Sequence, residues 1–111
     1  MGPVVLVLCT VPEAAALPLV DALLAERLIA CANLLGPLRS RYRWQGAIQD
    51  STETLLLLKT MPHLLAGLRA AIVARHPYEV PEVLEFTAAG GLDRYLQWVA
   101  GAVRPPAGGG Q

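Results

Sequence analysis

Hydrophobic residues form runs along the chain whose spacing changes from one segment to the next. Residues 3–9 (PVVLVLC) form a short apolar run rich in β-branched side chains, which is typical of a central strand covered on both faces. Residues 29–35 (IACANLL) and 52–59 (TETLLLLK) predict further strands in the same way. Residues 38–44 instead alternate strictly, with Leu38, Ser40, Tyr42 and Trp44 on one side and three arginines on the other. A turn around Gly46 follows this strand pattern.

Helical spacing appears in three other segments. Apolar residues recur at helical intervals from Leu17 to Leu28, after a Thr10–Glu13 pair that predicts a capping box. Pro18 disturbs this helix and predicts either a kinked first turn or a late start. A second helix is expected over about residues 62–75, with Thr60 as its cap. A last strand over residues 82–88 precedes a short helix that begins near Asp93 and stops before residues 105–106, both proline.

The predicted order is strand, helix, strand, strand, helix, strand and a C-terminal helix. With right-handed crossovers this order gives an α+β fold, the ferredoxin-like split βαβ sandwich. Its four-stranded antiparallel sheet is expected to run in the order 4-1-3-2, with helices on one face only. The other face is apolar in this sequence, which favours an assembly of several chains.

Length and composition agree with an assembling domain. The 111 residues suit one domain, expected at residues 1–104, followed by a flexible Pro/Gly-rich tail at residues 105–111. Hydrophobic residues make up 54% of the chain and the mean hydropathy is +0.44. Uncharged apolar runs stay well below the roughly 18–20 residues that a membrane span needs, so we expect no membrane span. Excess apolar surface is then expected to be buried between subunits.

Charge and cysteine content argue against a nucleic-acid-binding protein and against a disulfide-stabilised exported one. The formal net charge is zero, whereas a protein that binds nucleic acid through its phosphates is usually basic, so we expect no nucleic-acid partner. The three arginines of residues 38–44 are instead expected to form a solvated or partner-facing surface. Two cysteines do not make a disulfide framework, and no signal peptide is visible, so a reducing cytoplasm is expected. Cys31 fits a buried small hydrophobic residue.

The segment HPYEVPE, residues 76–82, concentrates polar chemistry between the second helix and the last strand. Pro77 should end the helix at His76, and the last strand should run antiparallel beside the first. His76 and Glu82 are therefore expected to lie near Cys9. A thiolate, an imidazole and a carboxylate suit Cu or Zn and leave a coordination position open. The competing interpretation is a histidine that caps a helix C-terminus beside a buried cysteine.

Six motifs in register resemble the CutA divalent-cation-tolerance family. They are VLCTVPE, ERLIACANL, SRYRWQG, LLLLKT, HPYEVPE and YLQWV, and the resemblance covers about residues 4–100. It implies a cytosolic, heat-resistant ferredoxin-like homotrimer in which the long hairpin reaches neighbouring subunits. It also implies binding of copper and other divalent ions, with no established catalytic reaction.

The resemblance also implies where these ions and other ligands bind. The family's proposed metal ligands fall on Cys9, His76 and Glu82. Residues implied to lie around a cleft between subunits are Trp44, Lys59, Tyr78 and Tyr95. This chain departs from the pattern in two ways. Arg75 replaces a second histidine found in some relatives, which removes a ligand and adds a cation, and the segment containing Pro18 is shorter than expected.

Two other functions compete with metal binding. A trimeric small-molecule or nucleotide sensor of the PII type would bind its ligand in clefts between subunits, where Lys59 could hold an anion and Tyr78 and Trp44 a flat ring. No glycine-rich phosphate loop supports that hypothesis. An enzyme with Cys9 as nucleophile and His76 as base is the other alternative, but the sequence shows neither an oxyanion donor nor a third orienting residue.

Overall fold

The computed structural model describes residues 2–106, so residues 107–111 of the tail expected at residues 105–111 lie outside this range. Its helices and strands follow the predicted order, with one 3-10 turn, η1, before the second helix. The bounds are β1 (Val5–Val11), α1 (Glu13–Ala25), β2 (Cys31–Trp44), β3 (Ala47–Thr60), η1 (Pro62–Leu64), α2 (Leu65–Arg75), β4 (Leu84–Thr87) and α3 (Asp93–Ala102).

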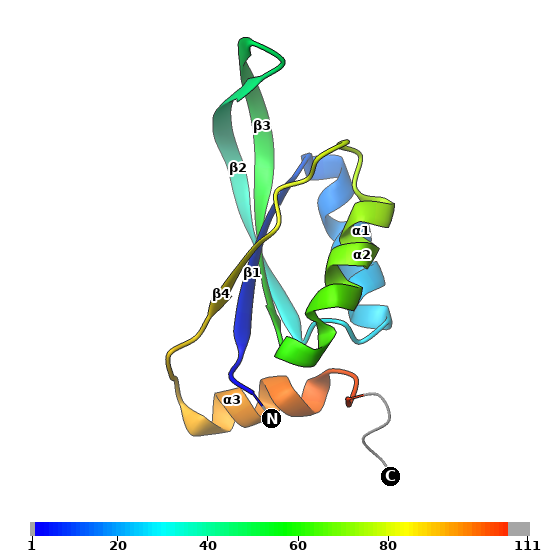
Figure 1. Ribbon diagram of the computed structural model, residues 1–111, viewed down its shortest axis with the longest axis vertical. Helices are drawn as coiled ribbons and strands as arrows, with labels where there is room; N and C mark the ends of the chain where they lie inside the picture. Colours follow the sequence, from blue (N-terminus) through cyan, green and yellow to red (C-terminus); the bar gives the residue numbers. More distant parts are fainter. Residues whose placement is uncertain (1, 107–111) are drawn as a thin grey trace.

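The four strands form one antiparallel sheet in the order β2-β3-β1-β4. This is the predicted order read from the opposite edge, so the ferredoxin-like α+β fold is confirmed. Helices α1 and α2 cover one face of the sheet, and α3 lies across its end near the N-terminus (Figure 1). None of the helices described within residues 2–106 is long and apolar enough to cross a membrane.

The hydrophobic core lies between the sheet and the two covering helices. Strand β1 alternates between buried and partly exposed positions, so Val5, Val7, Cys9 and Val11 face the helices. Buried leucines of β3 continue this layer, and the helices bring Leu23 and Ile72 against it. Burial of this apolar surface is the main favourable term in folding.

The opposite face of the sheet carries no helix. Directly paired residues of neighbouring strands share a face, and the apolar side chains that the register places here are Leu6, Leu8, Leu35, Leu55, Leu57, Leu84 and Phe86. We call this set the open sheet face. Glu85, between its two β4 members, points to the helical side and pairs with Arg69 of α2 at 2.6 Å. Leu84 and Phe86 remain 51% and 49% exposed.

Strands β2 and β3 form a hairpin that is much longer than the other strands. Only the segment from Thr54 to Thr60 of β3 pairs with β1, so the rest of the hairpin extends past the sheet. Gln45 and Gly46 make its two-residue turn with φ of 51° and 80°, the positive values that a tight hairpin turn requires. A register shift between Leu35 and Leu38 interrupts β2 where the hairpin leaves the sheet.

Two predicted caps are wrong, and so is the late start that was one of the two alternatives predicted from Pro18. Thr10 lies within β1, and Pro12 precedes α1 without a side-chain cap, because the strand continues two residues further than the apolar run. Pro18 lies inside α1, which begins early at Glu13 and continues to Ala25. Thr60 closes β3, and its hydroxyl donates to the carbonyl of Leu28 at 2.7 Å instead of capping a helix.

Candidate functional site at the end of β1

The connector between α2 and β4, residues 76–83, turns the chain back toward the end of β1. Helix α2 ends at Arg75, and His76 adopts an extended backbone with ψ of 139°, as predicted for the residue before a proline. Strand β4 begins only at Leu84, two residues after Glu82. The sequence therefore predicted the end of the helix correctly and placed the start of the strand slightly too early.

The thiol of Cys9 and the imidazole of His76 converge on one backbone oxygen. Nε2 of His76 donates to the carbonyl of Thr10 at 2.7 Å, and the Cys9 thiol donates to the same oxygen at 3.8 Å. Nδ1 of His76 accepts from the backbone N–H of Tyr78 at 3.1 Å, and the two rings lie 4.7 Å apart. The histidine thus joins the connector to β1 and uses both of its ring nitrogens.

The electrostatic surroundings of Cys9 keep its thiol protonated. Burial raises the pKa of the Cys9 thiol to about 12, and the negative charges of Glu82 and Glu53 add to this effect. Both carboxylates therefore act on the same group. Cys9 itself is fully buried on the helical side.

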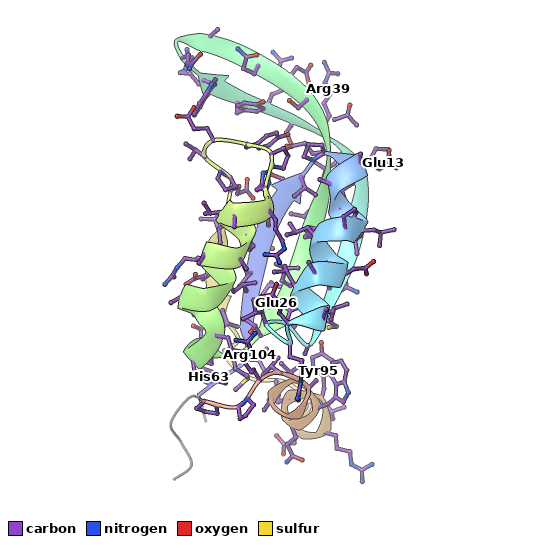
Figure 2. All side chains as sticks on the ribbon, turned by 90° about the vertical axis from the view of Figure 1, so that its right-hand side faces the viewer. Glu13, Glu26, Arg39, His63, Tyr95 and Arg104 are labelled. Atoms are coloured by element: carbon purple, nitrogen blue, oxygen red, sulfur yellow. The ribbon has the colours of Figure 1, made fainter. Side chains whose placement is uncertain are left out.

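A cavity lies between the connector and the hairpin. It measures about 340 Å³, and a smaller one of about 220 Å³ shares its aromatic lining, which comprises Tyr42, Trp44 and Tyr78. The hydroxyl of Tyr78 donates to the carboxylate of Glu53 at 2.7 Å. Burial raises the pKa of Tyr78 well above its usual range, with the hydrogen bond to Glu53 as the second cause. Figure 2 shows the hairpin bending over the connector with side chains between them.

The four residues implied to surround a cleft fall into two pairs within one chain. Trp44 and Tyr78 line the cavity just described. Lys59 instead hydrogen-bonds Asn33, and Tyr95 of α3 lies 3.5 Å from the sulfur of Cys31, which is the register partner of Lys59. The hydrogen bond with Cys31 and burial raise the pKa of Tyr95 to about 12.

Cys31 differs from the buried hydrophobic residue that the sequence indicated. Its side chain is only half-buried and makes a polar contact with Tyr95, because β2 is an edge strand and α3 crosses the end of the sheet beside it.

The arrangement at the end of β1 does not form a ready-made metal centre. Among residues 2–106, no group of three His, Cys, Asp or Glu side chains is close enough to hold an ion. His76 offers a metal no free lone pair while Nδ1 accepts from Tyr78 and Nε2 carries the proton. Metal binding through Cys9 and His76 would require deprotonation of the thiol and loss of at least one of these hydrogen bonds.

Sequence reasoning missed Glu53 as a member of the site. Glu53 is 4% exposed and stands one register step beyond the part of β3 that pairs with β1. A lone carboxylate on the same side of the strand as two leucines was a usable signal, since charged side chains are rarely buried without a partner. Its hydrogen-bond partner, Tyr78, was named only as a cleft residue that the family resemblance implies.

The fold and the site define a ferredoxin-like α+β protein in which a thiol, an imidazole and two carboxylates gather at the end of the first strand. The family model described as CutA1 divalent ion tolerance protein matches residues 5–102. The chain therefore belongs to the CutA1 family.

Relatives and solved structures agree with this assignment. The divalent-cation tolerance protein CutA of Thermus thermophilus is 45% identical over 94 residues, which cover 84% of this chain and 91% of the relative. The chloroplastic protein CutA of Arabidopsis thaliana is 38% identical over 92% of this chain, but the chain spans only 57% of that relative. The crystal structure of CutA1 from Oryza sativa superposes with a TM-score of 0.89 at 36% identity, covering 93% of this chain and 95% of the other.

Proposed function

We propose that the chain forms a homotrimer that binds divalent metal ions and acts in divalent-cation tolerance, with copper as the preferred ion and zinc as the alternative. Membership of a family described by divalent ion tolerance supports a role with these ions. The observation that carries the proposal within this chain is the shared hydrogen-bond acceptor of Cys9 and His76, the carbonyl of Thr10. A soft sulfur and an imidazole nitrogen directed at one point suit copper and zinc.

Cys9, His76 and Glu82 are the proposed ligands. Binding would replace the thiol proton and the Nε2 proton, and the imidazole would have to give up its bond from the Tyr78 N–H. Because ligand deprotonation is linked to metal binding, affinity should rise with pH. Glu82 is exposed, so it can turn toward an ion without breaking a buried contact.

Titration of copper and zinc into the native protein and into a Cys9→Ala, His76→Ala double variant tests the ligand assignment. The double variant should lose most of its affinity, because it removes both nitrogen and sulfur ligands. The chain offers a matched control, since its only other cysteine and histidine are Cys31 and His63. Cys31→Ala, His63→Ala should bind like the native protein.

The outcome against the assignment is equal affinity in the native protein and the Cys9→Ala, His76→Ala variant. Circular dichroism and solution mass should accompany each titration, since Cys9 is part of the core. Loss of binding in both double variants would point to a fold defect or to a site shared among all four residues, and would also remove the specific assignment.

We also propose a cytoplasmic location and no catalytic role. Both cysteines are free, which suits a reducing compartment. Relatives include a chloroplastic protein, so the family as a whole is not tied to one compartment. An active-site thiol needs a lowered pKa, whereas the pKa of Cys9 is raised to about 12 by burial and neighbouring carboxylates.

A second candidate is a PII-like trimeric sensor that binds a small molecule or nucleotide between subunits. The cavity beside Trp44 and Tyr78 favours a ligand with a flat ring. Lys59, the cation proposed to hold an anion, lies beside Cys31 and Tyr95 and does not line this cavity. A neighbouring chain would therefore have to bring its Lys59 and Tyr95 next to Trp44 and Tyr78 of this chain. Thermal stabilisation by nucleotides at concentrations above their dissociation constants would distinguish this candidate from metal binding.

A further inference from the structure

The cavity between the hairpin and the connector combines aromatic walls with carboxylates. Its aromatic members, Tyr42 and Trp44, point from one face of β2, and Tyr78 closes it from the connector. The full lining of the 340 Å³ cavity is Thr10, Ser40, Arg41, Tyr42, Trp44, Glu53, Tyr78, Val80 and Glu82. This volume is at the lower end for small-molecule sites, so the cavity suits a ligand of modest size.

The charge available inside the cavity is negative. Glu53 is 4% exposed and has one oxygen bonded by the Tyr78 hydroxyl. Glu82 lies on the same lining, and Glu79 borders the adjoining smaller cavity.

Arg41, the cation on the lining, does not neutralise these carboxylates. Its guanidinium binds Asp50 at 3.2 Å. Asp50 is the register partner of Arg41, and both point to the opposite side of the hairpin from Tyr42 and Ser40. Arg39 binds the same carboxylate at 2.5 Å, so a compact charge cluster holds Arg41 on that side.

We propose that this cavity binds a small organic cation of the alkylammonium class. The ring faces of Trp44 and Tyr42 attract a diffuse positive charge, and Glu53 supplies a counter-charge at the buried end. Val80 gives apolar contact to the alkyl groups. A bare metal ion suits this lining less well, because it requires closely grouped ligands and the described residues offer no such group.

The proposed site differs from the set of metal ligands on which the proposed function rests. Cys9 and His76 do not line the cavity, and only Glu82 is common to the two sites. Failure of one proposal therefore leaves the other standing. Glu53 is the informative residue to change, because it belongs to the cation site alone.

Choline and its uncharged carbon analogue, 3,3-dimethyl-1-butanol, provide a matched pair of probes. The chain has two tryptophans, so a Trp98→Phe background makes fluorescence report Trp44. Choline should bind at least roughly tenfold more tightly than the neutral alcohol, as expected for a cation over aromatic rings beside a carboxylate. Equal affinity for the two probes, or no response to choline, would overturn the proposal.

Glu53→Gln keeps an acceptor for the Tyr78 hydroxyl while it removes the charge. It should weaken choline binding roughly tenfold and leave binding of the neutral alcohol unchanged. Asp93→Asn, at the start of α3 on the far end of the molecule, is the matched control and should bind choline normally.

Tyr42→Leu keeps the proposal testable if Glu53→Gln does not fold. Tyr42 is exposed, and its hydroxyl forms a hydrogen bond with Ser51 across the hairpin at 3.0 Å. Loss of its ring should reduce choline affinity several-fold, whereas choline binding equal to that of the native protein would count against the aromatic site.

Discussion

The two cysteines have opposite surroundings although both lie on strands of the same sheet. Cys9 faces the core and is fully buried. Cys31 is half-buried on the edge strand and contacts the hydroxyl of Tyr95. A thiol reacts through its thiolate, so the raised pKa of Cys9 and its burial should protect it from reagents that reach Cys31.

Thiol labelling of the folded protein at pH 8 should therefore modify Cys31 and spare Cys9. At this pH, a thiol with a pKa of about 12 carries almost no thiolate. Peptide mass spectrometry after iodoacetamide treatment measures the modification of each residue. In Cys31→Ser, labelling should appear only after addition of denaturant, and fast labelling of Cys9 in folded Cys31→Ser would contradict the buried placement.

At the residue scale, local rules predicted only part of the site. The proline after His76 fixed the end of α2 from sequence alone, because its effect on the preceding residue is local. The predicted cap at Thr10 failed because strand pairing with β3 continues through Val11 and overrides the capping pattern. The burial of Glu53 depends on a tyrosine that is 25 positions away in the chain, and no local pattern reports such a contact.

Two arginines connect the C-terminal ends of α1 and α3. Arg104 donates from Nη2 to the carbonyl of Glu26 at 2.7 Å, and Arg27 donates to the carbonyls of Ala102 and Val103. Each arginine thus satisfies carbonyls at the end of the other helix, where a positive charge also suits the helix dipole. Figure 2 shows Arg104 beside Glu26 at this junction.

Arg104→Ala should destabilise the fold by about 1 kcal/mol, because it removes a charged donor from a helix C-terminus. Chemical denaturation measures the change in free energy of unfolding. Arg94→Ala is the matched control, since within residues 2–106 no hydrogen bond or ion pair involves the Arg94 side chain. Equal destabilisation by the two substitutions would show that the junction contributes nothing specific.

At the element scale, periodicity predicted every helix and strand but not their junctions. Alternation and helical spacing are properties of single segments, so they located β2, β3 and α1 despite Pro18. The reciprocal arginine contacts join residues from opposite ends of the chain, and His63 adds a bond of 2.7 Å to the carbonyl of Arg104. His63 is exposed and still takes part in this junction.

The distribution of apolar surface is uneven over the whole molecule. The helices cover one face of the sheet, while the open sheet face keeps large apolar side chains partly exposed. Monomeric proteins seldom leave contiguous apolar patches of large size uncovered. This face supports the proposed homotrimer, in which copies of the chain would cover one another.

The native protein should have a solution mass about three times the 11.8 kDa of one chain. Leu84→Glu together with Phe86→Glu should lower this mass, because both side chains lie on the open sheet face and a buried charge is costly. Light scattering coupled to size-exclusion chromatography measures the mass. Val73→Glu is the control, since Val73 is also exposed but belongs to α2. A single-chain mass for the native protein would rule the homotrimer out.

At the molecular scale, the sequence predicted the sheet order and the apolar character of its uncovered face. Both follow from connection rules and alternation. Residues 38–44 predicted strand structure up to a turn around Gly46, but no residue pattern predicted that the pairing of β3 with β1 stops at Thr54 and leaves the rest of the hairpin projecting. The cavity depends on that projection, so its shape could not be predicted from the sequence either.

The long hairpin places the cavity lining and the hydrophobic core on different parts of the same strands. Core packing is concentrated where β3 pairs with β1, whereas Tyr42 and Trp44 lie on the part that extends past this pairing. Substitutions near the tip should therefore change the lining of the cavity with little effect on the stability of the rest of the domain. With the proposed ligand bound there, such a division would let one stable scaffold change its selectivity through a single projecting arm.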